Sequence, residues 1–307
     1  MQISVIIPVY NAARFVESAV NSALQQPETA EVILVEDGSK DDSYRICQQL
    51  TADPRVKLLT HPGHENQGAS SSRNLGISNA TSPYIAFLDA DDTYSAERFS
   101  ISKEIFSLHP EADGTYETIG VQYHNPEQLQ RHLDRIEGGN TGIRIDSAPD
   151  TFFRVLATGK YGHVHLDGLV IRKSALEGFD VFDTHLVLGE DSDFILRLAA
   201  TRRLYGGDPN RIVAFRGVHD DNTVFHNPHA LLYRRKYLQK CIDHDFYGNK
   251  DLTGCMYIVS RRVGASPAYA PFRYLGKLAL PFKLLYITGY LLWHPGTLWN
   301  LMKRILK

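Results

Sequence analysis

The chain has 307 residues, of which 43% are hydrophobic and 22% charged, and its formal net charge at pH 7 is −2. This length fits one large domain or two modest ones, and the composition is that of a globular protein rather than a disordered one. The near-neutral balance gives no global electrostatic reason to bind nucleic acid. Cys47, Cys241 and Cys255 lie far apart without a CxxC pair, which disfavours a zinc knuckle or disulfide framework and fits a reducing compartment.

The first eighty residues alternate between short β-branched runs and amphipathic stretches, a pattern typical of parallel β-α-β units. The predicted strands are 3–9, 31–36 and 56–59, and the predicted helices are 12–26, 41–50 and 68–79. The first strand follows the amino terminus without a basic segment or a cleavage site, so we expect no signal peptide. The fold class predicted from this alternation is α/β.

The turn after the first predicted strand is unusual for a nucleotide-binding fold. Residues 8–12 contain neither a GxGxxG pattern nor a Walker lysine, the two glycine-rich signatures that cradle dinucleotides and triphosphates. This argues against an NAD-dependent dehydrogenase and a P-loop nucleotidase.

A fourth strand is predicted at the apolar run that begins at Tyr84, and it is followed at once by Asp89, Asp91 and Asp92. Ligands of open α/β sheets bind at the carboxyl ends of the strands. Carboxylates that converge there repel one another unless a cation joins them, and Mg²⁺ or Mn²⁺ with a phosphate ester is the simplest partner. The alternative is that Asp91 and Asp92 only cap a helix beginning near Ser95.

The alternation of strands and helices continues to about residue 225, and the pattern after that point is helical. Further strands are predicted at 118–123, 169–172 and 211–216, and helices at 191–201, from residue 150 and from about residue 228. We expect one domain at 1–225, with a nucleotide-binding half at 1–95 and an acceptor-binding half at 96–225, and a helical extension at 226–307.

The carboxy-terminal residues 272–307 mix lysines and arginines with aromatic side chains. Their uncharged apolar core at 284–293 is too short to cross a bilayer as a helix. It is typical of a segment that lies on an anionic membrane surface. The alternative is a helix pair that packs on the rest of the protein or on a second subunit.

Four motifs occur in a fixed order, and their order is a stronger signal than any of them alone. They lie at residues 4–11, 35–41, 66–76 and 87–92, with looser matches at 189–194 and 216–222. In this order they resemble the inverting nucleotide-sugar glycosyltransferases of family two. The resemblance implies a GT-A fold, a mixed and mostly parallel sheet flanked by helices, over about residues 3–225.

The resemblance also implies a donor site and a metal site. Pro8, Val9 and Tyr10 would form the wall of the base pocket, Asp37 would accept a hydrogen bond from the base, and Arg73 would face the diphosphate or the strand acids. Asp89 would hold the ribose and Asp91 the metal, Mn²⁺ or Mg²⁺, with His219 as a second ligand. The implied donor-binding residues are Pro8, Val9, Tyr10, Asp37, Arg73, Asp89, Ala90 and Asp91.

Inverting transfer needs a base that deprotonates the acceptor hydroxyl, and a carboxylate at the head of a helix suits this role. The resemblance places Asp191 there, with Glu190, His165 and Asp167 as acceptor-binding residues. The alternative is that Glu190 and Asp191 only complement the helix dipole.

The function implied is metal-dependent transfer of a sugar, with a UDP-sugar as the expected donor, to a glycan or lipid-linked acceptor in surface polysaccharide or glycolipid synthesis. We expect a cytoplasmic protein, with peripheral contact to the inner membrane face through residues 272–307. Two alternatives remain: a sugar-nucleotide pyrophosphorylase, and a protein that binds glycans or nucleotides without turnover, because a fold alone does not secure a function.

Overall fold

The computed structural model describes residues 1–123, 141–143, 145, 147–219, 230–249, 251–264, 280–296 and 298. The chain divides into two compact units. The first comprises residues 1–146, 162–184 and 203–222, and the second comprises residues 147–161, 185–202 and 223–307. The second unit is thus assembled from three separate stretches of the chain.

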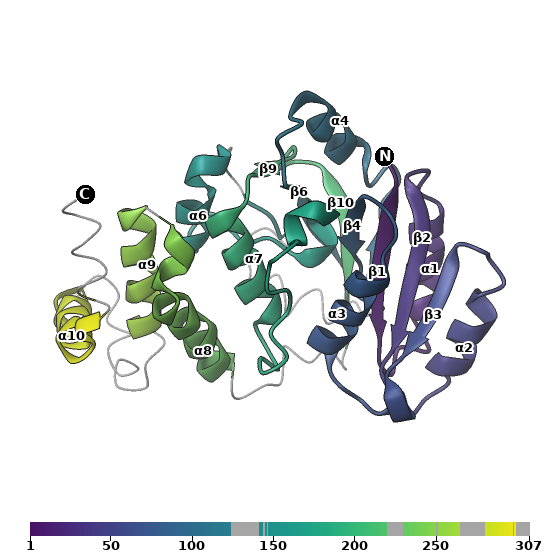
Figure 1. The fold of residues 1–307 in the computed structure, drawn as a ribbon, viewed down its shortest axis with the longest axis horizontal. Helices are drawn as coiled ribbons and strands as arrows, with labels where there is room; N and C mark the ends of the chain where they lie inside the picture. Colours follow the sequence, from purple (N-terminus) through teal and green to yellow (C-terminus); the bar gives the residue numbers. More distant parts are fainter. Residues whose placement is uncertain are drawn as a thin grey trace. The chain divides into compact units, whose positions relative to one another are not determined.

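A seven-stranded sheet in the order β3-β2-β1-β4-β8-β6-β9 organises the first unit (Figure 1). Its strands are β1 (Ile3–Val9), β2 (Thr29–Glu36), β3 (Val56–Thr60), β4 (Tyr84–Phe87), β6 (Gly114–Tyr116), β8 (Leu169–Arg172) and β9 (Leu204–Gly206). Strands β3, β2, β1 and β4 are parallel neighbours, and β8 is antiparallel to both β4 and β6. The predicted mixed, mostly parallel sheet is confirmed.

The helices of this unit are α1 (Val16–Leu24), α2 (Ser43–Leu50), α3 (Ala69–Asn79) and α4 (Ser100–Leu108). Strand β1 is buried on both faces, because alternate side chains meet different helices. Val5 and Ile7 belong to the same buried cluster as Val16 and Val20 of α1. Ile6 faces α3, where a Cβ added to Gly76 would lie 2.4 Å from its Cγ2.

The first unit also contains a second, three-stranded sheet in the order β5-β10-β7. It contains β5 (Thr93–Tyr94), β7 (Thr118–Tyr123) and β10 (Ile212–Val218). Strand β10 pairs antiparallel with β5, which follows the acids after β4, and parallel with β7. This pairing brings the end of β10 next to those acids, although about 125 positions of sequence separate Asp92 from Gly217.

The second unit is helical in its described parts. It contains α6 (Pro149–Thr158), α7 (Glu190–Thr201), α8 (Ala230–Asp243), α9 (Leu252–Gly264) and α10 (Leu280–Trp293). Helix α9 packs closely on α6, because a Cβ added to Gly254 would lie 2.9 Å from the ring of Phe153. Arg261 of α9 donates to the carbonyl oxygens of Leu156 and Ala157 and so satisfies the carboxyl end of α6.

Four short 3₁₀ turns complete the described elements: η1 (Pro62–His64), η2 (Leu166–Gly168), η3 (Lys173–Leu176) and η5 (Asp245–Gly248). Within the described ranges, no helix is both long and apolar enough to cross a bilayer. Of the segment predicted to contact a membrane, residues 272–279, 297 and 299–307 lie outside the described part of the chain. In its described part, Leu292 and Trp293 are largely exposed.

Candidate active site

The turn after β2 is fixed by contacts to two other loops. The amide of Asp37 donates to the carbonyl oxygen of Val9 at the end of β1. The two carboxylate oxygens of Asp37 accept hydrogen bonds from the amides of Gln67 (2.6 Å) and Gly68 (2.9 Å), just before α3. Asp37 therefore joins the ends of β1 and β2 to the start of α3, and its Oδ1 atom also lies 3.6 Å from Nε2 of His61.

Gly38 follows Asp37 with a φ of +73°, a conformation that side chains disfavour. A Cβ at this position would lie 2.5 Å from the carbonyl oxygen of His64. We expect Gly38→Ala to lower the free energy of unfolding by more than about 2 kcal/mol, because backbone strain and a backbone clash add. Gly63 is the matched control, since it has the same φ of 73° but its added Cβ would come no closer than 3.8 Å to Glu65.

For Gly63→Ala we expect only the cost of the left-handed conformation, about 1 kcal/mol. Urea unfolding monitored by circular dichroism measures both variants. Equal losses in the two variants would contradict the close approach of the two loops at Gly38.

The first acid after β4, Asp89, forms an ion pair with Arg73 of α3, with the Oδ1 and Nη2 atoms 2.8 Å apart. Burial alone would raise the pKa of Asp89, but the positive charge of Arg73, with smaller contributions from His165 and Arg216, holds it below its usual value. Asp89 is therefore an ionised carboxylate whose partner is a planar guanidinium. The sequence prediction offered Arg73 two partners, and the structure places it against the strand acids.

The second acid, Asp91, contacts His219, which follows β10. Its Oδ2 atom lies 2.9 Å from Nε2 of His219, and the imidazole ring stacks on Phe15 with the ring centroids 4.6 Å apart. About 29% of the Asp91 side chain is exposed, against 12% of His219. The two residues predicted to share a metal thus lie side by side, and both side chains are partly exposed.

The third acid, Asp92, is buried and does not cap a helix, because α4 begins only at Ser100. Its Oδ1 atom accepts a hydrogen bond from the amide of Gly217 (2.8 Å). Its carboxyl group also lies against the carboxyl group of Asp167, close enough for the two to share a proton. Asp167 in turn accepts from the amide of Asp89 at 3.2 Å.

This carboxyl pair has perturbed pKa values with a common cause. Burial is the largest contribution to both; it raises the pKa of Asp167 to about 7 and that of Asp92 well above its usual value. Neighbouring carboxylates, Asp89 and Asp91 among them, add to the effect. Asp167 is fully buried, so we assign it a supporting role beneath the acids, and the predicted contact with an acceptor stays a prediction.

A raised pKa in the folded state means that the native protein binds protons that the unfolded chain releases near pH 4. The contribution of the Asp92 and Asp167 pair to stability is therefore present at low pH and is lost as the pH rises towards about 7. Without added metal, we expect Asp167→Asn to flatten this decline, on the order of 2 kcal/mol, in urea unfolding at pH 5 and pH 7.5. A decline unchanged from the wild type would contradict the protonated pair, and the exposed Asp208 provides the control substitution, Asp208→Asn.

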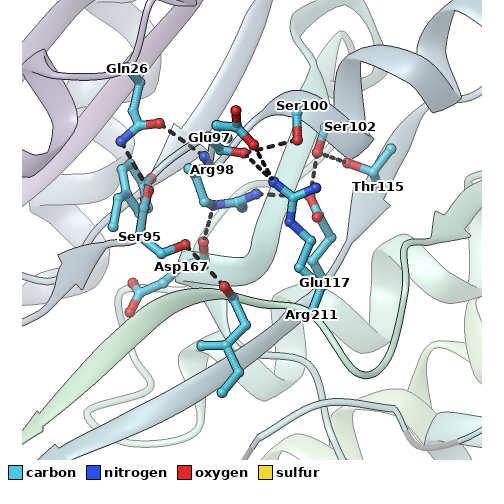
Figure 2. Close-up of polar contacts among 12 residues, drawn as sticks. Gln26, Ser95, Glu97, Arg98, Ser100, Ser102, Thr115, Glu117, Asp167 and Arg211 are labelled. Atoms are coloured by element: carbon cyan, nitrogen blue, oxygen red, sulfur yellow. Dashed lines mark hydrogen bonds and ion pairs between the residues drawn. The ribbon is translucent and has the colours of Figure 1, made fainter.

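Beneath this pair lies a buried arginine that the sequence reading did not single out (Figure 2). Arg98 is fully buried; its Nη1 atom lies 2.9 Å from Glu117, which is also buried, and its Nε donates to the carbonyl oxygen of Asp167. The Arg98 amide donates to Gln26 (2.9 Å). The main chain at Asp167 is therefore held by a charged network that is closed to solvent.

Two sets of side chains could hold a divalent metal. Asp91 and His219 are already adjacent, and a carboxylate with a neutral imidazole suits Mn²⁺. Asp89, Asp92 and His165 also offer ligand atoms within 4.8 Å of one another. In that second set Asp92 is occupied by the amide of Gly217 and by the shared proton, so the first pair fits a metal better.

The remaining predicted donor residues line the same end of the sheet. Val9 is completely buried, so only its backbone can face a ligand there; Pro8 is half-buried and Tyr10 is 47% exposed. Ala90 is buried between the acids. His165 precedes η2, and its Nδ1 atom lies 3.3 Å from Oδ2 of Asp167.

The predicted base belongs to the second unit. Glu190 and Asp191 are the first two residues of α7, after Gly189 with a φ of +81°. The Oδ1 atom of Asp191 accepts from the amide of Ser192 at 2.6 Å. The third acid of this turn, Asp193, is buried and serves as the structural partner of Arg197 and Lys240.

Comparison with known proteins places this geometry in a family. Residues 4–112 match the family model described as "Glycosyl transferase family 2". The chain is 30% identical over 215 residues to the minor teichoic acid biosynthesis protein GgaA of Bacillus subtilis, covering 66% of this chain and 44% of that protein. It is 33% identical over 187 residues to the uncharacterized glycosyltransferase alr2836 of a Nostoc species, covering 58% of this chain and 52% of that protein. The chain thus spans about half the length of these relatives.

Among solved structures, the chain is similar to residues 1–349 of Staphylococcus aureus TarS. The TarS structure in complex with UDP has a TM-score of 0.62 at 18% identity and covers 94% of this chain and 89% of that one. The structure in complex with UDP-GlcNAc has a TM-score of 0.60 at 17% identity and covers 87% of this chain and 82% of that one. At these identities the similarity establishes the fold alone. The ordered motifs, the family match and the mixed sheet together show that residues 4–112 form part of a glycosyltransferase family 2 domain and that the fold is GT-A.

Proposed function

We propose that the chain transfers a sugar from a UDP-sugar to a glycan or lipid-linked acceptor, with inversion and with the help of a divalent metal. The observation that carries this proposal is the pairing of Asp89 with Arg73 and of Asp91 with His219 at the carboxyl end of β4. Ligands of open α/β sheets bind at this edge. The ionised Asp89 beside Arg73 suits the hydroxyl groups of a ribose. Asp91 beside His219 suits a metal ion that binds a diphosphate.

In the donor site, Pro8, Val9 and Tyr10 would bound the base, and Asp37 would accept a hydrogen bond from its imide. Asp89 would hold the ribose hydroxyls. Ala90, which is buried between Asp89 and Asp91, would contribute to the donor site through its backbone. Arg73 would face the diphosphate as well as Asp89, because a guanidinium fork matches both carboxylate and phosphate oxygens. The complexes of TarS with UDP and UDP-GlcNAc support a UDP-linked donor.

Asp91 and His219 would hold Mn²⁺ or Mg²⁺. When bound, the ion supplies Lewis-acid stabilisation of the charge that develops on the departing nucleoside diphosphate. The stacking of His219 on Phe15 keeps the imidazole oriented towards Asp91. The buried network of Arg98, Glu117 and Asp167 would keep the loop of acids rigid while the donor binds and leaves.

Asp191 would act as the base. Its carboxylate would accept the proton of the acceptor hydroxyl while that oxygen forms a bond to the anomeric carbon, and the bond from that carbon to the diphosphate breaks on the opposite face. Glu190 and His165 would bind hydroxyl groups of the acceptor.

The names of the relatives suggest where such an activity belongs. GgaA and GgaB are described as minor teichoic acid biosynthesis proteins, so we propose a role in the synthesis of a surface polysaccharide. The expected site of action is the cytoplasmic face of the membrane, with residues 272–307 as the point of contact.

The test is incubation of the full chain with Mn²⁺ and a panel of UDP-, GDP- and dTDP-linked sugars, in the presence of phosphorylated and unphosphorylated glycan acceptors. We expect release of UDP coupled to a product whose anomeric configuration, determined by NMR, is opposite to that of the donor. A product of retained configuration would contradict inversion. Release of pyrophosphate from a nucleoside triphosphate and a sugar phosphate would favour a pyrophosphorylase instead.

A further inference from the structure

A cavity of about 370 Å³ lies on the second unit, between α8 and α9. Four cationic side chains line it: Arg235, Lys236 and Lys240 of α8, and Arg262 of α9. Among the described residues, the only acid in its lining is Asp243. Residues four positions apart share one face of a helix, so α8 presents its cations to the cavity as one surface.

The two arginines of this cavity have few hydrogen-bond acceptors among the described residues. Within the described part of the chain, Arg235 makes no hydrogen bond or ion pair, and its Nε atom is buried without an acceptor. Arg262 donates from its Nε to Oε1 of Gln239 at 2.9 Å, and its guanidinium lies over the ring of Tyr290, 5.7 Å from the centroid. Among the described residues, its two terminal nitrogens have no hydrogen-bond acceptor. A buried guanidinium donor without an acceptor is costly, so a ligand that supplies acceptors to both arginines would be stabilised.

The positive charge of the cavity is not balanced by its neighbours. Asp243 accepts from Nε2 of Gln239 at 2.8 Å, and Lys240 is turned to Asp193 at 3.2 Å. Burial, followed by repulsion from Arg235, lowers the pKa of Arg262. The cations of the lining therefore outnumber its acids among the described residues, and an excess of positive charge in one hollow favours an anion as ligand.

We propose that this cavity binds the phosphate group of a phosphate ester. Two guanidinium forks facing one hollow match the several oxygens of a phosphate better than the two oxygens of a single carboxylate. Lys236 adds a further point charge at the exposed rim. The site goes beyond the proposed function, since it would bind phosphate whether or not the chain transfers a sugar.

The phosphate can belong to a soluble ester or to a phospholipid headgroup, and two assays separate these sources. The first is calorimetric titration of the full chain with sn-glycerol 3-phosphate, carried out in the Asp91→Asn background so that the donor site does not contribute. The second is flotation with vesicles of phosphatidylcholine, with and without phosphatidylglycerol. Each assay is run with and without the double substitution Arg235→Gln and Arg262→Gln. The control is Arg234→Gln, which removes the same charge from an exposed position of α8 outside the cavity.

We expect the double substitution to weaken binding in at least one assay by about tenfold or more, because it removes the charge-assisted hydrogen bonds of both forks. The control should bind as the unsubstituted chain does. Loss of glycerol phosphate binding would identify a soluble ester, and loss of flotation with phosphatidylglycerol alone would identify a lipid. Binding that is absent from both assays, or equal in the double variant and the control, would overturn the proposal. Matching circular dichroism melting curves establish that the variants are folded.

Discussion

Asp191→Asn is expected to lower the rate of sugar transfer by at least about 100-fold while leaving the affinity for UDP unchanged. Removal of a general base has an effect of this size, because the acceptor hydroxyl must then lose its proton without help. Asparagine retains a side-chain oxygen, so the hydrogen bond from the amide of Ser192 survives at the start of α7. The loss is therefore chemical rather than structural.

The matched control is Glu190→Gln, which removes the neighbouring carboxylate of the same helical turn. Initial rates at saturating donor and acceptor, together with UDP titrations of each variant, separate chemistry from binding. We expect the Glu190 variant to keep most of the turnover rate and to show a raised KM for the acceptor. Full turnover by the Asp191 variant would remove it as the base, and a loss confined to the Glu190 variant would transfer the role to Glu190.

Arg98→Met is expected to destabilise the first unit by about 3–5 kcal/mol, because the substitution leaves the buried carboxylate of Glu117 without its cation. It also removes the donor to the carbonyl oxygen of Asp167. Urea unfolding followed by circular dichroism measures the loss. Arg45→Met is the control, since the ion pair of Arg45 with Asp42 is exposed and contributes about 0–1 kcal/mol.

A second substitution tests the cause of this loss. The double variant Arg98→Met and Glu117→Met replaces both charges with apolar groups, and we expect it to recover part of the lost stability. If Arg98→Met alone were as stable as the Arg45 control, the buried pair would not hold the unit together.

Much of the fold was predictable because long apolar runs determine buried strands. Strand β1 begins and ends where the sequence pattern placed it, and the apolar run from Tyr84 forms β4 with the acids at its carboxyl end. The sequence reading did not predict β5, β6 or β9. These strands have two or three residues each, too few to show a period, and they exist because distant strands offer them partners.

The candidate site was predictable only in part, for a related reason. The resemblance to the family linked Asp91 with His219 and offered Arg73 either the diphosphate or the strand acids; in the structure Asp91 contacts His219 and Arg73 contacts Asp89. Nothing in the local pattern marks Arg98, which follows Glu97 in a polar stretch and could equally face solvent. Its burial depends on Glu117 and on η2, and long-range pairing of this kind cannot be read from neighbouring residues.

The helix cap expected as the alternative role of Asp91 and Asp92 is wrong for a similar reason. A cap requires a helix within a few residues, whereas the next helix begins at Ser100. The chain first forms β5, which pairs with β10 and delivers the amide of Gly217 to Asp92. Long-range strand pairing thus decides what these acids contact.

The most direct test of a metal-dependent UDP-sugar site is calorimetric titration of UDP into the full chain with Mn²⁺ and with EDTA, repeated on Asp91→Asn. Asp41→Asn provides the control, because Asp41 accepts from the amide of Ala13 and from Ser43, away from the acids after β4. We expect the chain and the control to bind UDP at least about tenfold more tightly with Mn²⁺ than with EDTA, and the Asp91 variant to lose this difference. UDP binding that is indifferent to Mn²⁺, or equally metal-dependent in the Asp91 variant, would contradict the assignment of Asp91 to the metal.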